Sequence, residues 1–242
     1  MKPKAHTAAV SCTAVTRIYG EGDTAVHALR GIDLDIHSGE LMMLVGPSGC
    51  GKTTLISIIA GILDKTAGSC RVFGDDLAAM SSAQRTLWRR VNVGFVFQAF
   101  NLMPALTAVE NVAIPLLING VPRKTAIERA ADMLDRVGLG QRCHSLPAQL
   151  SGGQQQRVAI GRALVHGPRL VVCDEPTSAL DHETGHTVME VLRAVAAVDD
   201  RALVVVTHDA RIFNFADRIA HMDDGRITTI TADHVVREAA HA

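Results

Sequence analysis

Four short apolar runs, each followed at once by glycine or a polar residue, constrain the fold of this chain more than any other feature. They cover 41–45 before Gly46, 93–97 before Gln98, 170–173 before Asp174, and 203–206 before Thr207 and His208. Unbroken apolar runs of this length are typical of parallel strands covered on both faces. Because ligands of open parallel sheets bind outside the carboxyl ends of the strands, we predict an α/β fold with its functional residues at one sheet edge.

Other segments predict additions to this parallel core. Ile32, Leu34 and Ile36 alternate with polar residues, as in a half-exposed strand, and the Asp-Asp-Gly turn at 223–225 predicts a hairpin. Both features favour antiparallel strands in an otherwise mainly parallel, mixed sheet. Prolines at 104, 115, 122 and 147 punctuate helical segments such as 124–137. We interpret approximately 99–158 as a helical subdomain inserted into one domain that spans 8–242.

A glycine-rich motif connects the first apolar run to an expected helix at 54–62. It matches G-x-x-x-x-G-K-[ST] in the strand-to-helix context that a phosphate-binding P-loop requires. The glycines let backbone N–H groups close on phosphates, Lys52 reaches the outer phosphates, and the Thr53 hydroxyl can coordinate Mg²⁺. A plain glycine-rich turn is the alternative, and the lysine and threonine argue against it. The nucleotide-binding residues predicted here are Gly46, Pro47, Ser48, Gly49, Cys50, Gly51, Lys52, Thr53 and Thr54.

Five other side chains are weak signals when each is taken alone. Asp174 is the expected Mg²⁺ partner, and Glu175 beside it can orient and activate a water. His208 could hydrogen-bond near a γ-phosphate, and Gln98 could bind Mg²⁺ or the water. Tyr19, the only tyrosine of the chain, could stack on adenine. The alternatives are a solvated loop for the acidic pair, a structural role for His208, and a core or surface position for Tyr19.

A second anion site is predicted where a helix starts near residue 151. Ser151 can act as N-cap, and Gln154 completes a Ser-x-x-Gln capping box. Gly152 and Gly153 leave the first backbone N–H groups uncovered, and such groups at the positive end of a helix bind anions. The residues alone do not say which anion this second cradle serves.

Together these motifs resemble the ATP-binding cassette (ABC) family over nearly the whole chain and in the family's order. The matched positions are the adenine-stacking tyrosine (Tyr19), the P-loop (46–53), the Q-loop (Gln98), the highly specific Leu-Ser-Gly-Gly-Gln signature (150–154), the Walker B pair (Asp174 and Glu175), the D-loop (178–181) and the switch histidine (His208). The resemblance implies a RecA-like P-loop NTPase fold that hydrolyses ATP with Mg²⁺, the metal being held by Thr53, Gln98 and Asp174.

The resemblance also gives the second cradle a purpose. In this family two cassettes pack head to tail, and the signature of one caps the γ-phosphate held by the P-loop of the other. A second copy of the chain is therefore an expected partner in a two-fold dimer. The implied catalytic roles are charge neutralisation by Lys52, water activation by Glu175, ordering of water and phosphate by His208, and reporting to a partner by Gln98.

A finer resemblance links 19–31 and 94–104 to the lipoprotein-release, macrolide-export and cell-division branch of bacterial cassettes. In that branch the partner is an integral membrane permease that is worked by ATP-driven dimer closure. Phe100, Leu102, Met103 and Leu106 would then face the permease. Packing inside the helical subdomain is the alternative for each of them.

The sequence His182-Glu183-Thr184-Gly185-His186 matches a zinc-protease pattern, H-E-x-x-H. We do not favour a zinc site, because the match directly follows the D-loop, where Asp181 is the expected N-cap of a helix. Gly185 also weakens the helix that a metal site would need. The alternative that we prefer is a polar first helical turn.

Composition restricts the partners. A net charge of −1, with 24 basic and 25 acidic residues and no charge block, does not imply attraction to nucleic acid or to anionic lipid. Five cysteines without a Cys-x-x-Cys favour a reducing compartment. No apolar run approaches the roughly 20 residues that span a bilayer, so we expect no direct membrane insertion. The expected location is the cytoplasmic face of the inner (cell) membrane, through the permease.

We therefore predict the ATP-binding and ATP-hydrolysing subunit of a bacterial ABC transporter, of the export or mechanotransmission type. An ABC ATPase that regulates an envelope or cell-division process, and transports nothing, stays open as an alternative. An ABC ATPase of DNA repair or translation is less favoured. Repair members insert long coiled coils and translation members carry two cassettes, and the sequence has neither feature.

Overall fold

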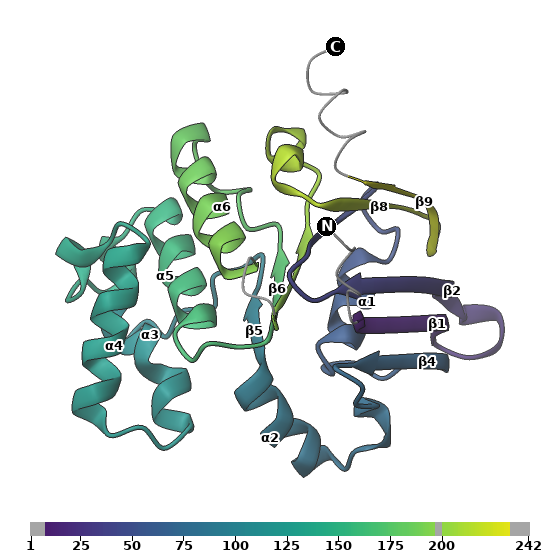
Figure 1. The fold of residues 1–242 in the computed structure, drawn as a ribbon, viewed down its shortest axis with the longest axis horizontal. Helices are drawn as coiled ribbons and strands as arrows, with labels where there is room; N and C mark the ends of the chain where they lie inside the picture. The colour runs from purple at the N-terminus through teal and green to yellow at the C-terminus, as the bar shows by residue number, and fades with distance from the viewer. Residues whose placement is uncertain (1–7, 197–199, 233–242) are drawn as a thin grey trace, which may run out of the picture.

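The fold of this computed structural model, which describes residues 8–196 and 200–232, is a mixed sheet between two unlike parts (Figure 1). The helices α3 (Ala108–Ile118), α4 (Arg123–Arg136) and α5 (Gly152–Leu164) lie at one end, and a separate antiparallel sheet lies at the other. The central sheet has the strand order β5-β6-β7-β3-β8-β9. Its strands are β3 (Leu41–Val45), β5 (Val93–Val96), β6 (Leu170–Asp174), β7 (Ala202–Val206), β8 (Arg218–Asp223) and β9 (Arg226–Ala232).

The parallel core is confirmed, with small differences at strand ends. Neighbouring strands from β5 to β8 pair in parallel, and only β9 runs antiparallel, to β8. The strand expected at 93–97 ends at Val96, and Phe97 stacks on Phe95 with ring centroids 4.2 Å apart. The predicted hairpin is also confirmed, because Asp223 pairs with Arg226 across the turn. Both central residues of that turn have positive φ, as a tight hairpin turn requires.

Two hydrophobic cores explain why the central strands are apolar on every residue. Leu41, Met43 and Val45 of β3 pack into the core shared with α3–α5 and α6 (His182–Ala196). The residues between them, Met42 and Leu44, pack into the second core, with α1 (Lys52–Ile59) and the antiparallel sheet. Strand β7 alternates in the same way. The sheet is therefore covered on both faces, and only its strand ends are free to carry chemistry.

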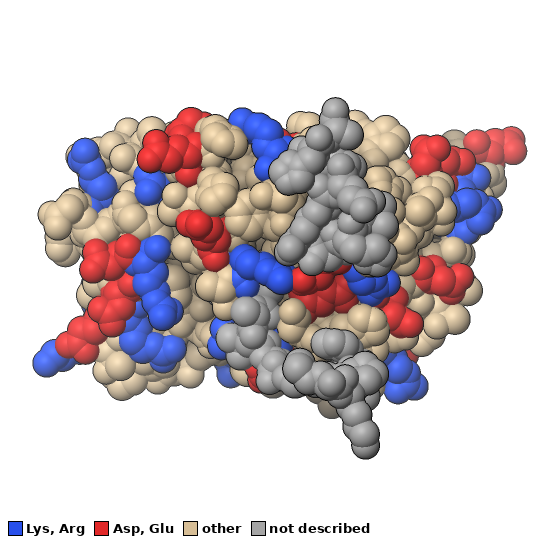
Figure 2. Space-filling model, turned by 45° about the horizontal axis from the view of Figure 1, so that its top comes forward, with Lys and Arg blue, Asp and Glu red and all other residues tan. Residues whose placement is uncertain are grey.

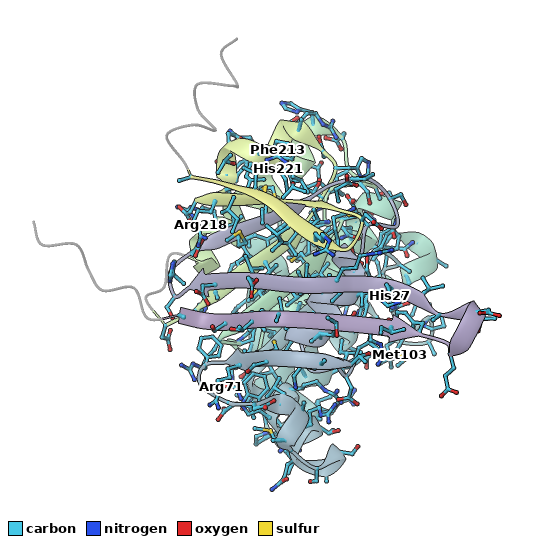
Figure 3. The ribbon with its side chains drawn as sticks, turned by 90° about the vertical axis from the view of Figure 1, so that its right-hand side faces the viewer. His27, Arg71, Met103, Phe213, Arg218 and His221 are labelled. Atoms are coloured by element: carbon cyan, nitrogen blue, oxygen red, sulfur yellow. The ribbon has the colours of Figure 1, made fainter. Side chains whose placement is uncertain are left out.

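The second sheet is antiparallel and has the order β2-β1-β4. Its strands are β1 (Ala8–Tyr19), β2 (Val26–His37) and β4 (Ala67–Val72). In Figure 3 this sheet faces the viewer, with His27 on β2 and Arg71 on β4. Ile32, Leu34 and Ile36 are buried while Asp33 and Asp35 are exposed, which confirms the predicted alternation.

The helices depart from the prediction at one proline. Helix α2 (Ser82–Asn92) precedes β5, and α3 follows it. Pro115 lies inside α3 instead of dividing two helices, so the expectation that it punctuates the chain is wrong. The helix continues because much of α3 is buried against α4 and α5, and this packing outweighs the lost backbone bond. The bounds 99–158 of the helical subdomain stay a prediction.

None of the helices in the described part of the chain combines the length and the apolar character needed to cross a membrane. The last part of the predicted domain, 233–242, lies outside the described residues.

Asn111 of α3 holds the turn at 103–107, directly before that helix. It is fully buried, and its Oδ1 accepts a hydrogen bond from the Met103 N–H at 2.8 Å. Its Nδ2 lies within hydrogen-bond distance of the carbonyls of Met103, Leu106 and Thr107, at 3.1, 2.9 and 3.1 Å. One side chain therefore provides hydrogen-bond partners for backbone groups of a turn that belongs to no helix or sheet.

We expect Asn111→Ala to lower the free energy of unfolding by about 3 kcal/mol, because it removes the hydrogen bonds of a fully buried amide and takes their partner from the Met103 N–H and the Leu106 carbonyl. Asn119→Ala is the matched control. That half-buried amide makes one hydrogen bond, to the Arg90 carbonyl at 3.2 Å, so its loss should cost about 1 kcal/mol or less. Chemical denaturation of both variants measures the difference. Equal costs would show that Asn111 does not hold the turn.

Candidate functional site

The loop from Gly46 to Thr53 is shaped by close backbone contacts. Gly51 has φ +99°, and a Cβ there would collide with the carbonyl of Ala28 on β2. A Cβ at Gly46 would likewise collide with the carbonyl of Met222 on β8. Only glycine fits at these two positions, so strands from both sheets fix the path of the loop. The Lys52 ammonium lies inside it and donates to the Gly46 and Pro47 carbonyls, both at 2.8 Å.

An open cavity of about 570 Å³ joins this loop to the ends of the central strands. Most of the predicted site residues line it, and so do Ala28 and Val206, which the sequence analysis missed. The predicted residues at the cavity are Gly46, Pro47, Ser48, Gly49, Gly51, Lys52, Thr53, Thr54, Gln98, Asp174, Glu175 and His208. The glycine-rich motif predicts eight of them, and position after a strand predicts the other four, whereas Ala28 belongs to neither signal.

Three groups of predicted residues do not line this cavity. Cys50 is buried beneath the loop, and its Sγ lies 3.6 Å from the Lys52 Nζ. Tyr19 is 37% exposed at the end of β1, and the Arg17 guanidinium lies over its ring, 4.6 Å from the centroid. The signature residues 151–154 belong to the start of α5 and do not line the cavity. One chain therefore does not bring both predicted phosphate cradles together.

Asp174 and Thr53 form a compact polar pair at the cavity. The Thr53 hydroxyl donates to the Asp174 carboxylate at 2.9 Å, across the gap between α1 and β6. Burial raises the pKa of Asp174, the neighbouring Glu175 adds to the rise, and the Thr53 hydroxyl and Lys52 oppose it. A buried carboxylate beside a hydroxyl is a ligand set that suits Mg²⁺, and a bound cation would offset the cost of burying the charge.

Glu175 is held in an unusual conformation. Its φ is +53°, and its N–H donates to the Val206 carbonyl at 2.9 Å. Its Oε1 lies 2.7 Å from the Nδ1 of His208. Its Oε2 is buried and has no hydrogen-bond partner among the described residues. One carboxylate oxygen is therefore fixed by the histidine, and the other is left to accept a bond from a ligand or a water.

The start of α5 has the geometry expected of the second cradle. Ser151 is the N-cap and accepts from the Gln154 N–H at 3.3 Å, while the Gln154 side chain accepts from the Ser151 N–H at 3.0 Å. The capping box is therefore confirmed. Ser151 and Gly152 are exposed, and Gly153 packs near Leu180 of the D-loop segment.

The four apolar side chains expected to face a permease differ in exposure. Met103 is 54% exposed, whereas Leu102 packs against the core and Phe100 and Leu106 are half-buried. Packing is therefore the better interpretation of Leu102, and Met103 is the side chain most open to a partner. On the face shown in Figure 2, basic and acidic side chains are interspersed over the surface.

The residues of the H-E-x-x-H match form the first turn and a half of α6. Asp181 accepts from the Thr184 N–H at 2.9 Å, which is the bond expected of an N-cap. His182 and Glu183 are exposed, and the His186 ring meets Phe215 edge to face at 5.0 Å. Within residues 8–196 and 200–232, no group of three or more His, Cys, Asp or Glu side chains has a geometry that could hold a metal ion.

Comparison with protein families gives one match that covers most of the chain. Residues 29–178 match the family model described as "ABC transporter". A lipoprotein-releasing system ATP-binding protein, LolD, of Pseudoalteromonas translucida is 39% identical over 226 residues, which cover 93% of this chain and 97% of that protein. A macrolide export ATP-binding/permease protein, MacB, of Aggregatibacter actinomycetemcomitans is 41% identical over 225 residues. Those residues are 93% of this chain and only 35% of the relative, so the chain spans about a third of its length.

A solved structure gives a similar result for the fold. A dimeric ATP-binding cassette in a post-hydrolysis state, bound to ADP and Pi, matches with a TM-score of 0.87 and 37% identity. The match covers 93% of this chain and 98% of the other. The P-loop NTPase fold is thereby confirmed, and so is the resemblance to the lipoprotein-release and macrolide-export branch.

The buried carboxylate of Asp174 gives a test with opposite signs. Folding raises the pKa of Asp174, so the fold is more stable when this carboxyl is protonated. The free energy of unfolding therefore falls as pH rises through the raised pKa and the carboxyl becomes charged. Asp174→Asn should therefore raise the unfolding temperature at neutral pH without nucleotide. It should also remove most of the stabilisation by Mg²⁺-ATP, which for a tight site is about 2.7 kcal/mol at a hundredfold excess over Kd.

Thermal unfolding with ATP plus EDTA is the control, since this condition should affect both proteins alike. If Mg²⁺-ATP stabilised the Asp174→Asn variant as much as wild type, Asp174 would not be part of a metal site.

Proposed function

The chain belongs to the ABC transporter family of ATP-binding cassettes, and we propose that it binds and hydrolyses ATP as a dimer that drives a membrane permease. The observation that carries this proposal is the split between the two cradles. The P-loop, Asp174, Glu175 and His208 share one cavity, whereas Ser151 and Gly152 lie exposed at the start of α5. A second chain in head-to-tail contact would supply the missing cradle, as the dimeric cassette structure suggests.

In this proposal each side chain of the cavity has a separate task. The backbone N–H groups of 46–53 hold the phosphates, and Lys52 exchanges its carbonyl partners for the outer phosphate oxygens. The free Oε2 of Glu175 accepts a hydrogen bond from the attacking water and then takes its proton, while His208 fixes the other carboxylate oxygen. Thr53, Asp174 and Gln98 would hold Mg²⁺, which would neutralise charge on the transferring phosphoryl group.

Residues outside the cavity complete the proposed nucleotide site. Tyr19 stacks on adenine with the ring face that Arg17 does not cover. Ser151, Gly152, Gly153 and Gln154 of the second chain offer backbone N–H groups and the serine hydroxyl to the γ-phosphate.

We also propose a membrane permease as the second partner. The LolD and MacB relatives are named as parts of lipoprotein-releasing and macrolide-export systems, which supports a role in export or mechanotransmission. The permease would hold the chain at the cytoplasmic face of the cell membrane and would contact Met103. Regulation of an envelope or cell-division process remains the alternative function, because it would use the same cassette and a similar partner.

The first prediction from this proposal concerns dimer lifetime. Glu175→Gln keeps the shape of the site but removes the carboxylate that activates water, which typically lowers a rate by about 10²–10⁴. With Mg²⁺-ATP the variant should run as a dimer on a sizing column, while wild type elutes mostly as monomer. A Glu175→Gln protein that stays monomeric at saturating ATP would contradict the proposed function.

A second substitution locates the cradle. Adding Ser151→Arg should abolish this dimer, because a bulky side chain would occupy the turn that meets the partner's phosphate. Ser81→Arg is the matched control, since Ser81 caps α2 with the same kind of capping box and is also exposed. Dimers that survive Ser151→Arg, or that are lost equally with Ser81→Arg, would show that the start of α5 is not the second cradle.

A further inference from the structure

Arg162, near the end of α5, reaches back to the segment that follows Gln98. Its Nη2 donates to the Phe100 carbonyl at 2.8 Å, and its Nη1 donates to the Asn101 carbonyl at 2.7 Å. The two bonds use one planar guanidinium fork on consecutive carbonyls, a geometry that arginine forms and lysine does not. The donor and acceptors are 61 and 62 residues apart in the chain, so the contact joins two segments that are distant in sequence.

The turn at this contact has an uncommon backbone conformation. Asn101 has φ +49°, in the left-handed region, which asparagine adopts more readily than most residues other than glycine. Arg162 is half-buried, and burial lowers the pKa of its guanidinium. A charged donor forms stronger hydrogen bonds to carbonyls than a neutral donor does, and partial burial limits the competition from water. Arg162 therefore fixes the turn at Phe100 and Asn101 relative to α5.

The same segment also touches the other end of α5. The Phe100 ring lies beside Gly152, where a Cβ would be 3.8 Å from the Phe100 Cζ. The segment 100–101 thus contacts α5 at two places. The Phe100 ring lies near the start of the helix, and the two carbonyls bond to Arg162 near its end. Gln98 lines the cavity only two residues before this tie.

We propose that Arg162 is a positioning residue that makes the segment after Gln98 and the helix α5 move as one body. This proposal rests on the proposed function of the cavity and of Ser151. When nucleotide shifts Gln98, the tie carries the displacement to α5 and sets the direction of its N-terminus. Arg162 thereby links occupancy of a chain's own cavity to the cradle that the same chain offers to its partner.

The test separates nucleotide binding from dimer formation. All variants carry Glu175→Gln, and analytical ultracentrifugation gives the Mg²⁺-ATP concentration at which half of the protein is dimeric. Arg162→Met keeps the length of the side chain but removes both bonds, so this midpoint should rise by about tenfold. Arg162→Lys keeps the charge without the planar fork and should raise it by about threefold.

Nucleotide affinity of the single chain is measured in the Ser151→Arg background, with a fluorescent ATP analogue. This affinity should be unchanged in Arg162→Met. Arg129→Met is the matched control, because the Arg129 Nη2 donates to the Val165 carbonyl at 3.2 Å, at the end of α5 and away from the Gln98 segment. It should lower the unfolding temperature without moving the dimer midpoint.

The outcomes are distinguishable. Failure of Glu175→Gln alone to dimerise contradicts the proposed function. If Glu175→Gln dimerises, three results would each overturn the role of Arg162. They are an unshifted midpoint in Arg162→Lys, an equal shift of the midpoint in Arg129→Met, and a loss of single-chain nucleotide affinity in Arg162→Met that matches its midpoint shift. A shifted midpoint with unchanged affinity supports it, and Arg162→Lys gives the answer even if Arg162→Met does not fold.

Discussion

Burial of the central sheet on both faces is the constraint on which the rest of the molecule depends. Each residue of β3 and β7 packs into one of two cores in turn, so these strands have no free face for chemistry. Polar groups can appear only where a parallel strand stops. Because the parallel strands stop at the same edge, Gly46, Asp174 and His208 meet there without any local attraction between them.

The antiparallel additions have a role beyond covering a core. The carbonyls of Ala28 on β2 and Met222 on β8 lie so close to the loop that only glycine fits at 51 and 46. The Gly225 N–H in the hairpin after β8 also donates to the Cys50 carbonyl at 3.1 Å. The phosphate loop is therefore clamped from both sides by strands that belong to no phosphate motif, which keeps its N–H groups in one arrangement.

Local signals explain which parts of the fold and of the site the sequence predicts. Apolar runs, the glycine-rich loop and the Ser151–Gln154 capping box each act within a few residues, and all were found. Pro115 was misjudged because burial of α3 overrides its local preference. Ala28 and Arg162 were missed for a different reason: a strand residue and an arginine that bonds to backbone carbonyls leave no pattern in the chain. The roles of the site residues remain predictions.

Helix α5 begins with two glycines, which are poor helix formers, and this choice of residues needs an explanation. Glycine stabilises a helix less than alanine does, by up to about 1 kcal/mol at interior positions. The capping box contributes about 0.5–2 kcal/mol, so the helix still begins at Gly152. A Cβ at Gly153 would lie 3.0 Å from the Leu180 Cδ2, whereas position 152 has room for alanine, which would favour the helix more. Neither position shows the positive φ that would demand glycine. Gly152 is exposed, and a residue without a side chain there lets another group approach the bare N–H groups closely. The P-loop cavity of the same chain does not supply that group, because Gly152 does not line it. The unfavourable composition of this turn is thus itself an argument that the cassette is completed by a second chain.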